Sequence, residues 1–490
     1  MSSRAWRNTP VSSLKSTAIY LPGILLPRVA ALGLIILMTH LLPKAEYGLL
    51  TLVITVGELV DTSLTTWVRL ALLRLGAGGQ ASRGLANVVL SLVALMTALG
   101  AGVSLIISLV LVPDRPLQFW IAVLAYVVSI TSLRVGLALL QLNDRNLTYS
   151  VLEMCRAVLS FAAAMTAAVV INDNFLAPSL AAAMSTFVVA MIALHKGYKG
   201  LHRTEQKFSF RDIVVFAGPL LFLSALAIFA NAMDRLILQY MAGAAAVGAY
   251  AAVYAIARQP IDVLANSLNA GGYPALVRRY ETGGQREAAA LLSHQLGFLS
   301  KLLLPPACVM LVMQQDLAHT LLPREYAEQS GPLFAIILAG ALAFNFRTVI
   351  FDNIFHLERR YRIQLQYFVF VLAAGTVLAA IAIPRFGVIG AALVFVTWTT
   401  LALMLSWFYG RSLIPVKLPN EDIGYALLLS GACSATVSVV LWLMHGQPHA
   451  MRLIAGGLVA TLTYLLLLAV IHREVAKEFI RQRDGATRAA

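Results

Sequence analysis

Long apolar stretches alternate with short polar connections along the whole chain. Each stretch holds about 20 residues or more, and a helix of that length crosses a hydrocarbon core about 30 Å thick. We therefore predict an all-α polytopic membrane protein. Its expected transmembrane helices number about 14 and lie at residues 18–42, 47–72, 85–112, 117–142, 150–171, 176–195, 213–240, 246–273, 292–315, 331–355, 363–383, 387–410, 422–444 and 449–472.

The composition agrees with this pattern. Of the 490 residues, 59% are hydrophobic and only 12% are charged, whereas soluble domains carry about 25% charged residues. No connection is long enough for a separate soluble domain. The net charge of +14 is typical of basic cytoplasmic loops in a membrane protein, so no nucleic-acid partner is expected. The three cysteines form no CxxC pair, and we expect no metal or disulfide site.

Lysine and arginine are distributed unevenly between the two sides of the predicted membrane. With a cytoplasmic N-terminus, and with basic residues toward the span ends counted with the adjoining loops, 27 of the 37 fall on the cytoplasmic side, five on the opposite side and five are assigned to the membrane interior. Positive charge gathers on the cytoplasmic side of membrane proteins. An even number of spans with both termini in the cytoplasm is therefore expected.

A weak internal repeat divides the chain. Glu46-Tyr47-Gly48 opens the second predicted span, and Val247-Gly248-Ala249-Tyr250 opens the eighth in the same way. Repeats of this kind are common in transporters, whose binding sites lie between the repeated parts. The predicted organisation is a six-helix lobe at 1–195, a basic cytoplasmic linker at 196–212, a second six-helix lobe at 213–410, and two extra helices with a basic tail at 411–490.

Five arginines inside the predicted spans are candidates for function: Arg28, Arg134, Arg235, Arg258 and Arg347. An arginine at the centre of a bilayer costs about 2.5–3.5 kcal/mol on insertion scales, and such residues usually face a water-filled interior. Several of them in one chain indicate an anion that passes through that interior.

Arg28 and Arg258 are the deepest of the five. Each lies about ten residues into its span, so roughly 15 Å deep, and each is beside a proline, Pro27 and Pro260. Such helix breaks are tolerated in membranes where neighbours or water satisfy the freed backbone groups. Both arginines are therefore candidates for binding an anion. For Arg258 a second interpretation stays open, because Asp262 is four residues away on the same helix face and could neutralise it.

The other three arginines are less deeply placed. Arg134 and Arg347 lie in the cytoplasmic parts of their spans, where they either line the interior or extend to the membrane surface. Arg235 follows Asp234, and Asn231 lies one turn away. For Asn231, Asp234 and Arg235 the favoured interpretation is a structural polar cluster.

Two acids share one face of the second span. Glu58 and Asp61 are three residues apart at mid-depth. Acids at this depth often carry protons or bind sodium ions, so these two and Asp262 are candidates for coupling transport to Na⁺ or H⁺. The alternative is that Glu58 and Asp61 are counter-ions to Arg28 on the adjacent span.

Motifs for catalysis are missing from the sequence. It has no glycine-rich phosphate loop with its lysine, no HExxH, no GxSxG and no CxxC. We therefore expect no enzyme, no resident cofactor and no metal.

Several short motifs follow one another in the order typical of a known family. They are Phe216-Ala-Gly-Pro219-Leu-Leu, Asp234-Arg235-Leu-Ile-Leu and Val247-Gly248-Ala-Tyr250, with Leu42-Pro43-Lys-Ala-Glu46-Tyr47-Gly48-Leu49 and Leu321-Leu322-Pro323-Arg324-Glu325-Tyr326 in supporting positions. With the span count, this set resembles the polysaccharide (Wzx-type) flippases of the MOP superfamily over nearly the whole chain. That superfamily includes the lipid II flippases and the MATE drug exporters.

The resemblance implies two six-helix bundles around a central cavity with alternating access. It implies a multi-pass protein of the bacterial inner membrane that moves undecaprenyl-diphosphate-linked oligosaccharides for surface or exopolysaccharide biosynthesis. Membrane lipids are then partners, and a polysaccharide polymerase and assembly proteins are further candidates. Related lipid II flippases carry arginines in the first and eighth helices, where Arg28 and Arg258 lie in this chain.

The resulting hypothesis places a diphosphate on Arg28 and Arg258, with Arg134 and Arg347 as additional candidates, because planar guanidinium groups bind phosphate oxygens in pairs. Two alternatives remain. A MATE-like cation exporter would be expected to favour acids over arginines in its cavity. A membrane polymerase or glycosyltransferase would be expected to carry a sizeable outer loop, whereas the longest here is about 316–330.

Overall fold

The computed structural model describes residues 10–76, 82–171, 174–202 and 210–488. Within them, side chains are described except at 10–25, 211–212, 214–224 and 471–488. The described residues form α-helices, one short π-helix and an isolated parallel bridge between Ser82 and His202, without a named strand. The predicted all-α class is confirmed.

The first six helices match the first six predicted spans. They are α1 (Pro10–Leu41), α2 (Lys44–Leu75), α3 (Arg83–Leu111), α4 (Pro116–Leu142), α5 (Asn146–Val170) and α6 (Leu176–Lys199). Local signals place their ends. Pro43 is extended directly before α2, the Ser82 hydroxyl accepts a bond from the Leu85 amide at the start of α3, and Pro116 occupies the first turn of α4.

The next segment is far too long for one crossing. α7 (Phe210–Val312) has 103 residues, and a straight helix of that length would measure about 150 Å. Gly243 and Gly284 have φ values of +80° and +68°, and a left-handed residue interrupts the helical repeat. These two glycines divide α7 into three segments, which correspond to the seventh, eighth and ninth predicted spans.

The remaining helices are α8 (Gln314–Leu321), α9 (Arg324–Ala327), α10 (Ser330–Phe346), the π-helix η2 (Arg347–Phe351), α11 (Asp352–Leu357), α12 (Tyr361–Leu413), α13 (Asn420–Leu443) and α14 (His449–Arg488). α12 is broken at Gly387, where φ is 53°. With α12 in two parts and α10, η2 and α11 as one span, the described residues hold about 14 membrane-length segments. The predicted multi-pass architecture is confirmed.

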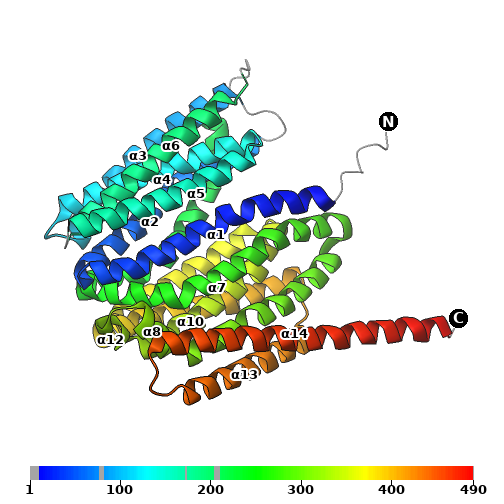
Figure 1. Cartoon of the computed structure of the whole chain (residues 1–490). Coiled ribbons are helices and arrows are strands. Elements are labelled where there is room, and N and C mark those ends of the chain that lie inside the picture. Colours follow the sequence, from blue (N-terminus) through cyan, green and yellow to red (C-terminus); the bar gives the residue numbers. More distant parts are fainter. Residues whose placement is uncertain (1–9, 77–81, 172–173, 203–209, 489–490) are drawn as a thin grey trace, which may run out of the picture. The chain divides into compact units, whose positions relative to one another are not determined.

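The chain separates into two compact units, Met1–Ala255 with Phe368–Val394 and Ile256–Tyr367 with Phe395–Ala490. In the first unit, α2 to α6 form a bundle in which α4 contacts α2, α3, α5 and α6 (Figure 1). Buried apolar side chains such as Val68, Leu85 and Leu139 fill its interior. In the second unit, α13 and α14 pack together, and α14 also contacts α8. The predicted lobe boundaries stay a prediction.

The two glycines of the internal repeat lie directly against each other within the first unit. A Cβ atom on Gly48 would lie 1.9 Å from the carbonyl oxygen of Ala244, and one on Gly248 would lie 2.3 Å from that of Lys44. The repeat therefore marks a contact between the start of α2 and the middle of α7. Only glycine permits this approach of two backbones.

Candidate functional site

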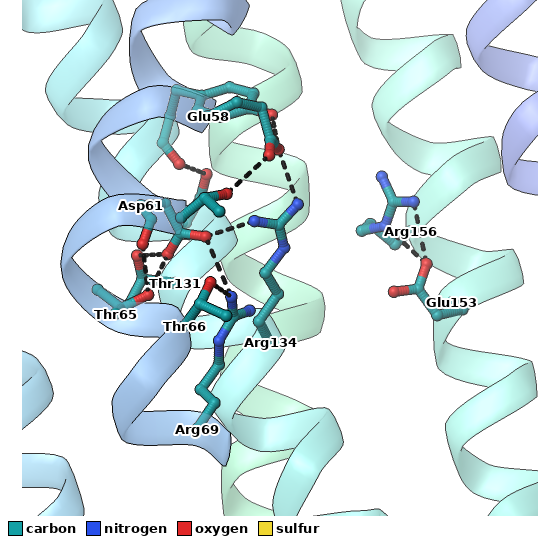
Figure 2. Close-up of polar contacts among 12 residues, drawn as sticks. Glu58, Asp61, Thr65, Thr66, Arg69, Thr131, Arg134, Glu153 and Arg156 are labelled. Atoms are coloured by element: carbon teal, nitrogen blue, oxygen red, sulfur yellow. Dashed lines mark hydrogen bonds and ion pairs between the residues drawn. The ribbon is translucent and has the colours of Figure 1, made fainter. Parts of the chain in front are cut away.

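The strongest polar cluster of the first unit is centred on Asp61 of α2 (Figure 2). Its side chain is fully buried, and one carboxylate oxygen pairs with the Arg134 guanidinium from α4. The other oxygen accepts hydrogen bonds from the hydroxyls of Thr131 at 2.5 Å and Thr65 at 2.6 Å. These contacts compensate the removal of the carboxylate from water.

Glu58 lies one turn away and shares the same arginine. A carboxylate oxygen of Glu58 is 2.7 Å from Nη2 of Arg134 and accepts a hydrogen bond of 2.8 Å from the Tyr126 hydroxyl. The side chains of Glu58 and Arg134 are 28% and 29% exposed, in contrast to the buried Asp61. Arg134 therefore bridges the buried carboxylate of Asp61 and the partly solvent-exposed carboxylate of Glu58.

Arg69 completes the cluster. Its Nη2 is 3.6 Å from Asp61 and donates to the Thr66 hydroxyl at 2.7 Å. Two guanidinium groups and two carboxylates thus gather between α2 and α4, and their formal charges cancel. Sequence reasoning missed Arg69, Thr131 and Tyr126, because no local signal shows that α2 and α4 are neighbours.

The carboxylates of this cluster pair with Arg134 and Arg69, whereas one sequence interpretation made them counter-ions to Arg28. Arg28 lies on α1, partly exposed, and forms no ion pair with the side chains that the structure describes. Its neighbour Pro27 lines a cavity of about 230 Å³ inside the first unit. Arg28 therefore differs from the other candidate arginines, each of which contacts a carboxylate or an aromatic ring.

The same cavity touches the Asp61 cluster. Tyr126, which donates to Glu58, lines the cavity wall together with Ser129 and Arg156. Arg156 belongs to a separate pair on α5, and its Nε and Nη2 atoms are 3.0 and 2.9 Å from one carboxylate oxygen of Glu153 (Figure 2). The cavity combines a mainly apolar wall with these few polar groups, a composition typical of ligand pockets.

In the second unit, Arg258 pairs with Asp262 as the helix spacing allowed. Nε of Arg258 is 2.9 Å from the carboxylate, which also accepts a 2.6 Å hydrogen bond from the Asn345 amide of α10. The Arg258 side chain is only 9% exposed, and its guanidinium lies 4.2 Å from the ring centre of Phe344. Cation–π contact and ion pairing together hold this arginine inside the unit.

Arg347 also contacts the Phe344 ring. Its guanidinium is 5.0 Å from the Phe344 ring centre, and Nε is 3.2 Å from Asp352. Asp352 also accepts hydrogen bonds from the hydroxyls of Tyr367 at 2.9 Å and Ser406 at 3.0 Å. The Arg347 side chain is 3% exposed, so it packs within the second unit and does not extend to the surface.

Arg347 is also the first residue of η2. A single turn of π-helix within an α-helical span inserts an extra residue, and such bulges are frequent at functional sites. Here the π-helix lies between α10 and α11. Arg347 is its first residue, and Asp352 directly follows its last residue.

Asn231, Asp234 and Arg235 make local contacts within the first unit. Asp234 accepts a 2.6 Å hydrogen bond from the Tyr250 hydroxyl, and the Arg235 guanidinium lies 4.2 Å from the Tyr254 ring centre. The Asn231 amide donates to the Ala227 carbonyl at 2.9 Å. Both tyrosines follow Gly243, so these contacts join the two helical segments on either side of that turn.

The similarity of the sequence to known proteins decides the family. The model of a family described as "Polysaccharide biosynthesis protein" matches residues 13–279, more than half of the chain. The chain belongs to this family. No match was found among curated protein sequences.

Solved structures of the MOP superfamily share the fold of this polysaccharide biosynthesis protein. A lipid II flippase, MurJ, in an inward closed conformation has a TM-score of 0.73 at 12% identity, over 94% of this chain and 100% of the flippase. A MOP superfamily transporter from Pyrococcus furiosus has 0.57 at 14%, over 82% and 95%. The Vibrio cholerae MATE transporter VcmN has 0.56 at 14%, over 82% and 97%. The resemblance predicted from the sequence motifs is confirmed.

The side chains of one family-like motif in this chain, Phe216-Ala-Gly-Pro219-Leu-Leu, are among those that the structure does not describe. Residues 203–209, the centre of the predicted basic linker at 196–212, lie outside the described residues as well. Among the residues that are described, no three His, Cys, Asp or Glu side chains gather closely enough to hold a metal ion.

Glu46, within the Leu42–Leu49 motif, joins the start of α2 to two connections of the first unit, the one between α3 and α4 and the one between α5 and α6. Its carboxylate is 2.5 Å from Nη2 of Arg115 and accepts a 2.9 Å hydrogen bond from the Phe175 amide. We expect Glu46→Gln to lower stability by about 1.5–3 kcal/mol, because hydrogen bonds to charged groups contribute about that much. Thermal unfolding of the purified protein measures the loss.

A matched control for this variant is Glu328→Gln. Glu328 also pairs with an arginine, Arg324, but the two side chains are 57% and 88% exposed. Exposed ion pairs contribute about 0–1 kcal/mol, so this control should unfold close to the unmodified protein. Equal shifts for both variants would contradict the role assigned to Glu46.

Proposed function

We propose that this protein is a flippase that moves undecaprenyl-diphosphate-linked oligosaccharides from the cytoplasmic to the outer leaflet of the bacterial inner membrane by alternating access. Membership in a polysaccharide biosynthesis family and a fold shared with a lipid II flippase support it. Both termini would lie in the cytoplasm, and a polysaccharide polymerase with its assembly proteins would receive the flipped unit.

The observation that carries the proposal is the environment of Arg28. Of the four arginines considered for the diphosphate, Arg28 is the one that is partly exposed and forms no ion pair with a described side chain, and its neighbour Pro27 lines a cavity. A diphosphate has about two negative charges, which a planar guanidinium binds through paired hydrogen bonds. Arg28 is therefore the first contact that we assign to the diphosphate.

Arg134, Arg258 and Arg347 would take part differently, because each already pairs with a carboxylate. A phosphate oxygen binds them only by sharing or replacing that carboxylate. Since a ligand shifts a conformational equilibrium only by its differential affinity for the two states, such exchange would link substrate binding to the change between inward and outward states.

For the coupling ion, Glu58 is the acid that fits best. It is 28% exposed, whereas Asp61 is fully buried and saturated by four partners. Asp262, at 26% exposure, is the corresponding acid of the second unit. Uptake of H⁺ or Na⁺ at Glu58 would weaken its ion pair with Nη2 of Arg134 and leave that nitrogen available to an anion, while Nη1 stays paired with Asp61.

Complementation tests the proposal. In a strain that depends on this gene for its surface polysaccharide, Arg28→Ala should abolish the polysaccharide while membrane levels of the protein hold. Arg28→Lys should restore part of it, because the charge remains without the paired geometry. Arg324→Ala, at an 88% exposed side chain, is the control and should behave as the unmodified gene. A normal amount of surface polysaccharide with Arg28→Ala would contradict the role assigned to Arg28.

A MATE-like cation exporter is the second candidate, and the exposed carboxylate of Glu58 favours it. The two functions predict different phenotypes for Glu58→Gln and Arg28→Ala. An exporter would lose resistance to cationic drugs with Glu58→Gln and keep it with Arg28→Ala. A flippase would show no change in drug resistance with either variant.

A polymerase or glycosyltransferase is disfavoured by the position of Asp316, an acid of the longest outer connection. Its side chain is 3% exposed, 2.7 Å from Nδ1 of His449 and 3.3 Å from Nη1 of Arg452. These contacts fasten α8 to the start of α14 and occupy the carboxylate. The proteins that share the fold are transporters and flippases.

A further inference from the structure

An apolar groove of about 380 Å³ lies within the second unit, on the face formed by α7, α10, α12 and α13. Leu296 and Leu304 of α7, Leu403 and Trp407 of α12, and Leu418 line it, and almost all of its surface is apolar. Its volume falls within the range of about 300–1,000 Å³ that is typical of small-ligand sites. An acyl chain is apolar along its whole length and therefore matches such a surface in a membrane.

Two basic residues are neighbours of side chains that line this groove. The Arg411 guanidinium is 5.3 Å from the ring centre of Trp407, which lines the groove, and both residues are exposed. Lys417 is exposed and directly precedes Leu418, another lining residue. Neither basic side chain forms an ion pair within the described part of the chain. They therefore differ from Lys301, which pairs with Asp422 at 2.7 Å.

The local backbone holds these residues in place. The hydroxyl of Ser293 on α7 donates a 2.7 Å hydrogen bond to the carbonyl oxygen of Lys417, which attaches the α12–α13 connection to α7. The Arg411 guanidinium also lies 4.9 Å from the Phe408 ring centre. Tryptophan beside arginine is typical of the interface between hydrocarbon and headgroups.

We propose that this groove binds an anionic phospholipid, with an acyl chain against Leu403 and Trp407 and the phosphate on Arg411 and Lys417. By the distribution of basic residues, the α12–α13 connection lies on the cytoplasmic side, where anionic lipids attract basic residues. The site would be occupied whether or not the chain moves lipid-linked sugars.

The groove is also bordered by the π-helix of the second unit. Phe351, the last residue of η2, lines it, and Asp352 is the next residue. An acyl chain packed on Phe351 would support the π-helical turn that presents Arg347 to Asp352. Bound lipid is therefore expected to raise the thermal stability of the second unit.

The test is lipid binding to the full-length protein in a neutral detergent, measured by native mass spectrometry and by thermal stabilisation. Phosphatidylglycerol should bind and stabilise, and phosphatidylcholine should do so far less. Arg411→Gln with Lys417→Gln should weaken phosphatidylglycerol binding roughly 30-fold, the product of the usual contributions of two basic residues near an anionic surface.

The matched control removes two other exposed arginines of the predicted cytoplasmic side, Arg278→Gln with Arg286→Gln, and should leave binding unchanged. Equal loss in this control would overturn the site, since general surface charge would explain the binding. Equal binding of phosphatidylcholine would overturn the headgroup assignment. Stabilisation by inorganic phosphate alone, or displacement of phosphatidylglycerol by undecaprenyl phosphate at lower concentration, would overturn the phospholipid as occupant.

Discussion

Replacing Asp61 by alanine is expected to lower the free energy of unfolding by about 3 kcal/mol or more. Removing one partner of a buried ion pair costs about 3–5 kcal/mol, because the charge left behind loses its compensation. Asp61 is fully buried and pairs with both Arg134 and Arg69, and it also accepts bonds from two threonines. The unfolding temperature in detergent and the folded yield from membranes measure the loss.

The control for this variant lies in the same cluster. Glu58→Ala removes a carboxylate from Arg134 as well, but the Glu58 side chain is 28% exposed and Asp61 remains. Solvent screens such a pair, so a loss of about 1 kcal/mol is expected. If Asp61→Ala unfolds no earlier than Glu58→Ala, burial does not set the strength of this cluster. A double variant with Arg134→Met then isolates the coupling between Asp61 and Arg134.

Among the glycines whose surroundings the structure describes, Gly48 is the one where substitution by alanine should lower stability most. The new Cβ would lie 1.9 Å from the Ala244 carbonyl oxygen and 3.0 Å from the Gly248 nitrogen. These are backbone atoms, so relief requires that α2 and α7 separate. Overpacking usually costs about 1–3 kcal/mol, and a clash with backbone belongs at the upper end. Gly248→Ala should act alike, because its Cβ would lie 2.3 Å from the Lys44 carbonyl oxygen.

The matched control is Gly102→Ala in α3, where a Cβ meets nothing within 4 Å. Alanine is favoured over glycine within a helix by about 0.5–1 kcal/mol, so this control should unfold at the same or a higher temperature. Gly48→Ala and Gly102→Ala make the same chemical change in helices of the same unit. Similar unfolding temperatures for the two would contradict the close approach of α2 and α7.

The fold was largely predictable from the sequence, because each span follows from local rules. The length of apolar stretches predicted about 14 helices, and the observed boundaries agree within a few residues for α2 to α6. Gly243 and Gly387 break long helical segments close to the predicted gaps before the eighth and twelfth spans. A lipid solvent requires every backbone group to be bonded within the helix, which makes the pattern easy to interpret.

The sequence also identified charged residues within the spans as candidates, but it did not predict most of their ion-pair partners. Helix spacing alone proposed the pair of Arg258 with Asp262, and the structure contains it. Nothing in the sequence joined Arg134 to Asp61, because that pair depends on α2 and α4 lying side by side. For the same reason Arg69 was not among the candidate residues, and the groove between α7, α12 and α13 left no sequence signal.

The sequence by itself determined the helices, their approximate number, the family and the set of charged residues within the spans. These properties depend on hydrophobicity, chain length and short motifs, which act over neighbouring residues. The tertiary structure alone decided which charges are neutralised. Asp61 and Glu58 hold Arg134, Asp352 holds Arg347, and Arg28 pairs with no described carboxylate. Coulomb attraction depends on distance in space and on burial, so it is set only when helices far apart in the chain pack together.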